Sequence, residues 1–173
     1  MNRLSSLLLL GLAPLIFACR STDQGEASAQ VEGLRVTLEE LYLAFNFDPG
    51  AEPDWATQRR IYLEGATFVP PISPGRAPVG EDTETFLEGF RQYATSPPFS
   101  ATGFHERIIG TRISVFGGVA HAFVLFEGFR PGDGVTRTRG MDSLQFVHDG
   151  EGWRLSAFAT QYEGPGVSLP AEL

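Results

Sequence analysis

"HERIIGTRISVFGGVAHAFVLFEGFR", residues 105–130, carries branched and aromatic residues on both sides of a Gly-Gly pair. Two such runs separated by two glycines are typical of a β-hairpin, with Gly117 and Gly118 as a two-residue loop. A loop of this length pairs Phe116 with Val119. The sequence therefore predicts two long antiparallel strands at 105–116 and 119–130.

Two more segments of similar composition come after the hairpin. The turn "PGDG" (131–134) leads into a strand expected at 136–148, and "DGEG" (149–152) leads into one at 153–162. Glycine-containing turns between such segments indicate successive antiparallel strands. The second half of the chain is thus predicted to be a four-stranded meander.

Helical periodicity precedes the strands. A first amphipathic helix is indicated by apolar residues at helical spacing, namely Leu34, Leu38, Leu41 and Phe45. Asp54 offers an N-cap for a shorter helix at 55–65, "ATFVPPISPG" contains a brief strand, and 81–94 predicts a third helix. Helices followed by a meander predict an α+β domain with the helices on one face of a curved sheet.

Four stretches, in this order, carry a family resemblance: "DWATQRRIYLEGATFVPP", "FLEGFRQY", "FGGVAHAFVLFEG" and "FVHDGEGWRLSAF". They resemble successive landmarks of the nuclear transport factor 2-like superfamily, which includes SnoaL-like polyketide cyclases and ketosteroid isomerases. The resemblance covers Leu34 to Tyr162. It implies a cone-shaped curved antiparallel sheet wrapped around the N-terminal helices, with an apolar pocket at the wide end. Family members include isomerases, dehydratases, epoxide hydrolases and binding proteins, so this fold does not specify a function.

The N-terminus has the layout of a secretory signal peptide. Arg3 precedes an apolar core at 7–17 that is shorter than the roughly 20 residues a membrane-spanning helix needs. Residues 16–19, Ile-Phe-Ala-Cys, resemble the lipobox of bacterial lipoproteins, in which the cysteine is diacylated and the chain is cut before it. This interpretation predicts a lipid-anchored protein of the bacterial cell envelope, facing the periplasm. An ordinary signal peptide, with Cys19 lost or incidental, is the alternative.

The predicted organisation is a signal peptide at 1–18, a flexible tether at 19–33, one nuclear transport factor 2-like domain at 34–163 and a C-terminal tail at 164–173. The tether is expected because its sequence is small, polar and glycine-containing. Cys19 is the only cysteine, so no intrachain disulfide can form.

Composition excludes several kinds of function. The net charge of −8 argues against nucleic acid as a partner, since no basic stripe is present to neutralise phosphates. All 13 basic residues are Arg, which rules out Schiff-base and phosphate-loop lysines. His105 and His148 lie far from any second histidine, and no Gly-rich phosphate loop appears, so we expect no metal and no cofactor.

Strand alternation suggests a candidate catalytic pair. If "PGDG" and "DGEG" are four-residue loops, the concave face carries Arg112, Ser114, His121, Phe123, Leu125, Asp142, Leu144, Trp153, Leu155, Ala157, Ala159 and Gln161. His121 then lies diagonal to Asp142, and a carboxylate beside an imidazole raises its basicity, as a general base requires. The alternative is a structural histidine, with Asp142 acting as a cap or pairing with Arg112.

The sequence supports three functional hypotheses. The first is a tethered domain that binds a small apolar molecule in a pocket lined by Tyr62, Tyr93, Arg112, Ser114, Phe123, Leu144 and Gln161. The second is an isomerase, dehydratase or hydrolase-like enzyme that works through His121 and Asp142. The third is an interaction module that forms a homodimer through the outer face of the sheet.

Overall fold

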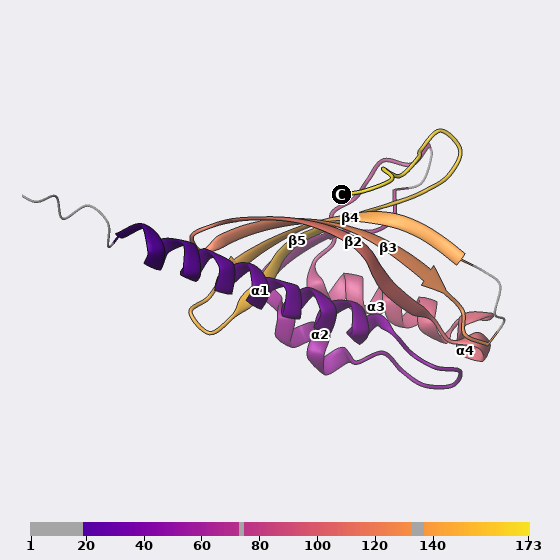
Figure 1. Cartoon of the computed structure of the whole chain (residues 1–173). Coiled ribbons are helices and arrows are strands. Elements are labelled where there is room, and N and C mark those ends of the chain that lie inside the picture. Colours follow the sequence, from indigo (N-terminus) through magenta and orange to yellow (C-terminus); the bar gives the residue numbers. More distant parts are fainter. Residues whose placement is uncertain (1–18, 73–74, 133–136) are drawn as a thin grey trace, which may run out of the picture.

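A curved five-stranded sheet covered on one face by helices forms the body of the molecule (Figure 1). The computed structural model describes residues 19–72, 75–132 and 137–173. The α+β architecture predicted from the sequence is confirmed. The predicted signal peptide at 1–18 lies outside the described residues.

The helical layer has four elements, α1 (Cys19–Phe45), α2 (Trp55–Ile61), α3 (Thr83–Thr95) and α4 (Phe99–Thr102). The Asp54 side chain accepts a hydrogen bond from the Thr57 N–H at 3.0 Å, which caps α2 as predicted. Asp82 caps α3 in the same way through the Thr85 N–H at 2.8 Å. The short α4 lies in a segment whose proline and serine content predicts a loop.

Helix α1 begins at Cys19, whereas residues 19–33 were expected to be a flexible tether. The Trp153 indole N–H donates to the Gln30 carbonyl at 3.1 Å, which holds the later part of this segment against the sheet. Alanine, glutamine and glutamate in "EASAQVE" also favour helix. In the part of the chain that the structure describes, no helix is both long and apolar enough to cross a membrane.

The strands are β1 (Tyr62–Val69), β2 (His105–Phe116), β3 (Val119–Phe129), β4 (Arg137–His148) and β5 (Trp153–Tyr162), arranged in the order β1-β5-β4-β3-β2. The predicted meander is confirmed. However, β1 pairs in parallel with β5, so the sheet is mixed and not wholly antiparallel.

Two details of register differ from the sequence prediction. Phe116 does pair with Val119 across the two-glycine turn. The next connection is longer than "PGDG", because the last β3–β4 pair is Phe129 with Arg137, which leaves the odd number of residues 130–136 between them. In β5 a bulge lets Leu155 pair with Phe146 while Ala157 pairs with Gln145. Because alternate residues face opposite sides, each irregularity reverses the facing of the residues beyond it.

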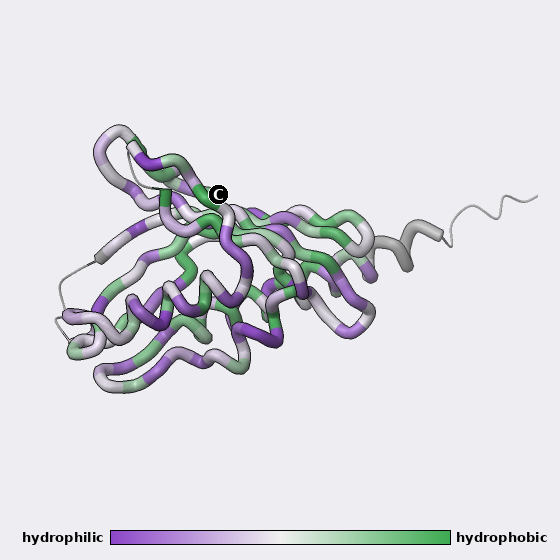
Figure 2. The backbone as a smooth tube through the Cα atoms, turned by 180° about the vertical axis from the view of Figure 1, so that it is seen from behind, coloured by the Kyte–Doolittle hydropathy of each residue, from purple (hydrophilic) through white to green (hydrophobic). Residues whose placement is uncertain are grey.

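The core fills the space between the helices and the concave face of the sheet. Phe45 and Trp153 are buried in one continuous cluster, as predicted, together with Leu34, Leu38 and Leu144. Figure 2 shows hydrophobic residues recurring along the strands, while the peripheral loops are largely hydrophilic.

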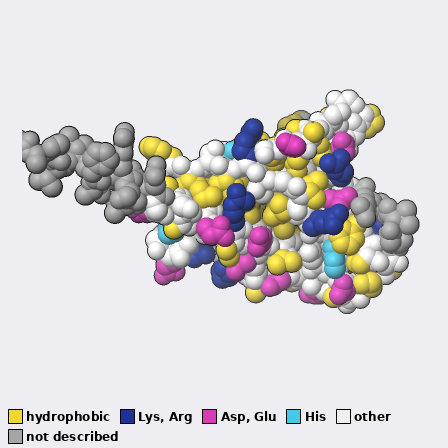
Figure 3. Space-filling model, viewed as in Figure 1, with side chains coloured by type: hydrophobic (Ala, Val, Ile, Leu, Met, Phe, Trp, Pro, Cys, Tyr) yellow, Lys and Arg dark blue, Asp and Glu magenta, His cyan; other side chains and the backbone are white. Residues whose placement is uncertain are grey.

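The helical surface is charged. Figure 3 shows acidic and basic side chains interspersed over the face that carries α1 and α2. One of these contacts is the ion pair of Arg60 with Glu40, 2.9 Å between nitrogen and oxygen, and both side chains are exposed. Exposed pairs of this kind contribute at most about 1 kcal/mol, so the buried cluster carries the stability of the fold.

Candidate functional site

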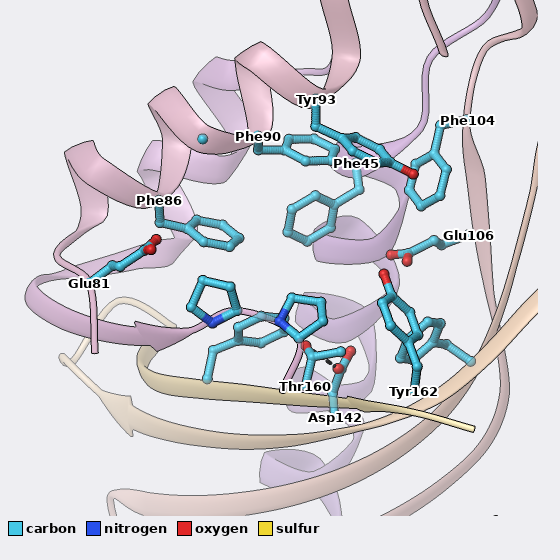
Figure 4. Close-up of a pocket in the computed structure, with 15 residues that line it drawn as sticks. Phe45, Glu81, Phe86, Phe90, Tyr93, Phe104, Glu106, Asp142, Thr160 and Tyr162 are labelled. Atoms are coloured by element: carbon cyan, nitrogen blue, oxygen red, sulfur yellow. Dashed lines mark hydrogen bonds between the residues drawn. The ribbon is translucent and has the colours of Figure 1, made fainter. Parts of the chain in front are cut away.

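A cavity of about 390 Å³ opens between α3, the end of α1 and the concave face of the sheet (Figure 4). Its volume falls in the range of roughly 300–1,000 Å³ that small-molecule sites occupy. Six phenylalanines line it, Phe45, Phe86, Phe90, Phe104, Phe126 and Phe158. Tyr93, Tyr162, Pro70 and Pro71 add further apolar surface.

The aromatic lining follows from local structure. Phe86, Phe90 and Tyr93 recur at positions i, i+4 and i+7 of α3, so they share the face that looks toward the sheet. The ring centroids of Phe90 and Phe45 are 5.0 Å apart in an edge-to-face arrangement. On β4, a Cβ atom at Gly140 would lie 2.3 Å from the Phe126 ring, so glycine leaves the space that this ring occupies.

Asp142 is the first of two carboxyl groups that β2 and β4 turn toward this cavity. Its residue is 3% exposed, and the side chain accepts hydrogen bonds from the Tyr42 hydroxyl and, at 2.7 Å, from the Thr160 hydroxyl. Burial raises the pKa of Asp142 to about 7, although the hydrogen bonds from Thr160 and Tyr42 act in the opposite direction. These donors on α1 and β5 hold the carboxyl group in one orientation.

Glu106, near the start of β2, is the second carboxyl group. Asn46 fixes its backbone, since the Asn46 Oδ1 accepts from the Glu106 N–H at 2.6 Å. Burial, followed by the negative charge of Asp142, raises the pKa of Glu106 to about 8. Among the described residues none donates a hydrogen bond to this carboxyl group, which faces the cavity (Figure 4).

Two tyrosine hydroxyls accompany Glu106. Figure 4 shows the hydroxyl ends of Tyr93 and Tyr162 directed toward its carboxyl group from opposite sides. Burial and then the charge of Glu106 raise the pKa of both tyrosines, so both hydroxyls are protonated at neutral pH and can donate hydrogen bonds. Glu81 also lines the cavity, on the side away from Glu106 (Figure 4).

The arrangement combines an anchored carboxyl group with a free one. Asp142 has its hydrogen bonds satisfied by protein groups, whereas the Glu106 carboxyl is available to a molecule in the cavity. Because the pKa values of both are near neutrality, each can hold or release a proton under ordinary conditions. Such a site can transfer protons in an apolar surrounding. The described residues contain no cluster of His, Cys, Asp and Glu that could hold a metal ion.

The predicted pairing of His121 with Asp142 is wrong. Asp142 is opposite Val124 on the concave face, whereas His121 pairs with Gln145 on the convex face. The His121 ring lies 3.0 Å from the Ser143 hydroxyl oxygen instead. The physical reason is the odd length of the β3–β4 connection, which reverses the faces of β3 relative to the prediction, while Asp142 on β4 stays on the concave face.

The same reversal places Arg112, Ser114 and Phe123 on the convex face, with Arg112 stacked 5.2 Å from the Phe123 ring. The β5 bulge does the same to Gln161, and none of the four lines the cavity.

Of the remaining predictions, Tyr93 does line the cavity. Tyr62 and Leu144 are on the inner side but belong to the packed core and not to the lining. Strand alternation predicted that Phe158 points away from the pocket. The β5 bulge instead turns it toward the cavity, where it forms part of the wall.

Sequence reasoning missed Glu106, Thr160 and Tyr42. The sequence did contain a signal for Glu106. In a strand, Phe104, Glu106 and Ile108 lie on the same face, so Glu106 is a carboxylate between two apolar residues that face the core. Tyr42 occupies the apolar face of α1 and had no feature to separate it from core residues. Its contact with Asp142 joins residues 100 positions apart.

Solved structures with the same architecture place this fold in a known class. A protein of unknown function from Silicibacter pomeroyi, described as NTF-2 like, is 20% identical, with 79% of this chain and 98% of that chain covered and a TM-score of 0.54. A protein from Streptomyces avermitilis, proposed to be a dehydratase of the NTF2-like family, is 14% identical, with 80% and 99% covered and a TM-score of 0.63.

A third similar structure is an NTF2-like protein with a cystatin-like fold from Novosphingobium aromaticivorans, 13% identical, with 86% and 92% covered and a TM-score of 0.60. No protein-family model matches the chain, and no curated protein matches it. The chain has an NTF2-like fold, in agreement with the resemblance seen in its sequence.

Proposed function

We propose that the domain binds a small, largely apolar molecule in the aromatic cavity and transfers a proton on it, as an isomerase or a dehydratase-like lyase would. The observation that carries the proposal is the pair of carboxyl groups, Glu106 and Asp142, enclosed by aromatic rings with pKa values near neutrality. The likeness to a proposed dehydratase in fold is consistent with this class of reaction.

Glu106 is assigned the role of general base because its carboxyl group is free of protein hydrogen bonds among the described residues and faces the cavity. As a carboxylate it removes a proton from an activated C–H bond, and the electron pair of that bond moves toward an electronegative atom of the substrate. The hydroxyls of Tyr93 and Tyr162 stay protonated when Glu106 is ionised, and they are the donors available to that atom. The apolar walls lower the local dielectric, which strengthens each of these interactions.

We expect the protein to accelerate the ring opening of 5-nitrobenzisoxazole, a general probe for a carboxylate base in an apolar cavity. Glu106 takes the ring C–H proton, its electrons form the nitrile, and the N–O bond breaks to release a coloured phenolate. The rate should rise with pH through the pKa of Glu106 at about 8, because the base must be ionised. Glu106→Gln should lower kcat/KM about 100-fold or more.

Glu88→Gln is the matched control, since Glu88 is an exposed residue of α3 that pairs with Arg91 at 2.7 Å away from the cavity. Its rate should equal that of the wild type. Equal rates for Glu106→Gln and wild type would contradict the assignment of Glu106. They would leave a binding domain without turnover as the better description.

We further propose that the domain is anchored in the bacterial envelope by a lipid on Cys19, on the basis of the lipobox-like residues 16–19. Two acyl chains are sufficient for stable anchoring. Expressed with its full N-terminus in a bacterial host, the protein should fractionate with membranes and incorporate labelled fatty acid. Cys19→Ser should remain unprocessed and unlabelled, while Ser21→Ala should behave as wild type. An unlabelled, soluble wild type would contradict the anchor.

A further inference from the structure

We propose that the ligand of this cavity is an organic cation, such as an aromatic or alkyl amine carrying a protonated or quaternary nitrogen. The inference rests on the proposed function in that it concerns the same cavity, and it names the class of molecule that the cavity selects. It is drawn from the kinds of side chain that surround the cavity.

The first observation is charge. Three carboxyl groups line the cavity, Glu81, Glu106 and Asp142, and among the described lining residues none is basic. Arg130 acts electrostatically on Tyr93 and lies 5.8 Å from the centre of the Phe99 ring, but it does not line the cavity. Where these groups are ionised, an anionic ligand would therefore meet only like charge among the lining residues, and a cation would meet opposite charge.

The second observation is the aromatic wall. Six phenylalanines and two tyrosines surround the carboxyl groups, so a cation in the cavity lies within reach of several ring faces. Such faces attract organic cations, and they do so more strongly when the site is shielded from water. A quaternary or alkylated ammonium group also buries its apolar substituents against the same rings.

The third observation is the unfilled bonding capacity of Glu106. Its carboxyl group accepts no hydrogen bond from a described residue, whereas Asp142 is held by Tyr42 and Thr160. Isolated carboxylates are costly to bury, and a positive ligand supplies the missing partner. A bound cation also favours the ionised form of Glu106, which is the form that a general base requires.

The test compares phenyltrimethylammonium with tert-butylbenzene, two probes of nearly the same shape that differ in charge. Dissociation constants are measured by ligand-observed NMR at pH 9 and pH 5. At pH 9 the cation should bind at least tenfold more tightly than its neutral counterpart. At pH 5 the affinity for the cation should fall at least tenfold, because Glu106 and Asp142 become protonated, whereas the affinity for tert-butylbenzene should not fall.

Glu106→Gln and Asp142→Asn should each reduce the preference for the cation, with Glu88→Gln as the unaffected control. Equal or tighter binding of tert-butylbenzene at pH 9 would overturn the inference, as would failure of the cation to bind. Ring opening of 5-nitrobenzisoxazole that depends on Glu106, with no preference for the cation, would overturn this inference alone. A preference for the cation without that reaction would retain the inference and overturn the proposed proton transfer.

Discussion

The free energy of unfolding should decrease by several kcal/mol between pH 5 and pH 9. The pKa of Glu106 is about 8 and that of Asp142 about 7 in the folded protein, against ordinary values of 4.5 and 3.8. Between these limits the folded state holds more protons than the unfolded state, so stability falls as pH rises. Each group contributes a slope of about 1.4 kcal/mol per pH unit within its window.

Surface carboxylates do not cancel this trend. Hydrogen bonds, chiefly from backbone N–H groups, lower the pKa values of Asp54, Asp82 and Asp149. Stability from these groups is lost as pH falls through their lowered pKa values, and above about pH 5 it is already complete. The decrease from pH 5 to pH 9 therefore reports on the two groups at the cavity.

Urea unfolding at a series of pH values measures this dependence. Glu106→Gln should flatten the part of the curve nearest pH 8 and make the protein more stable than wild type at pH 9, while Glu88→Gln should reproduce the wild-type slope. Stability that is constant or rises from pH 5 to pH 9 would contradict buried carboxyl groups that keep their protons at neutral pH.

Replacement of Trp153 by alanine should cost about 3–5 kcal/mol of unfolding free energy. The Trp153 residue is 4% exposed, belongs to the main core cluster, and donates its indole N–H to the Gln30 carbonyl at 3.1 Å. The substitution removes the ring contacts and also releases α1 from the sheet at this point. Urea unfolding of the purified variant measures the loss.

Trp55 provides a matched comparison. It is only partly buried, and its indole N–H donates to the Glu52 carboxylate at 3.1 Å on the exposed side of the molecule. Trp55→Ala should therefore cost clearly less than Trp153→Ala. Similar losses for the two variants, or a cost below about 1 kcal/mol at Trp153, would be inconsistent with the role of Trp153 in joining α1 to the sheet.

The fold was predictable because its signals are local. The two-glycine turn, the Asp54 cap and the apolar spacing of α1 each act over a few residues, and all of them agree with the structure. The parallel pairing of β1 with β5 was not predictable in this way, because it joins segments far apart in the chain, such as Tyr62 and Leu155, through an irregular register. The helical segment before Leu34 depends on a contact with Trp153, which is similarly distant in sequence.

The site was less predictable because the face on which each strand residue lies depends on the exact lengths of the connections and on the positions of bulges. Asp142 was correctly predicted to lie on the concave face. The same prediction placed His121 there, whereas His121 lies on the convex face. One odd connection and one bulge were enough to move Arg112, Phe123 and Gln161 out of the cavity and to bring Phe158 in. Composition does not specify loop length or bulge position, so alternation alone cannot define a pocket across three strands.

Glu106 and Asp142 retain protons near neutral pH inside the aromatic cavity, and the proposed chemistry depends most directly on this property. Carbon-detected NMR of the side-chain carboxyl groups, followed from pH 3 to pH 10, measures it for each residue. We predict pKa values of about 8 for Glu106 and about 7 for Asp142, and a lower pKa of Glu106 in Asp142→Asn, where the neighbouring negative charge is absent. Titration of both carboxyl groups below pH 5 in the wild type would contradict the proposed site.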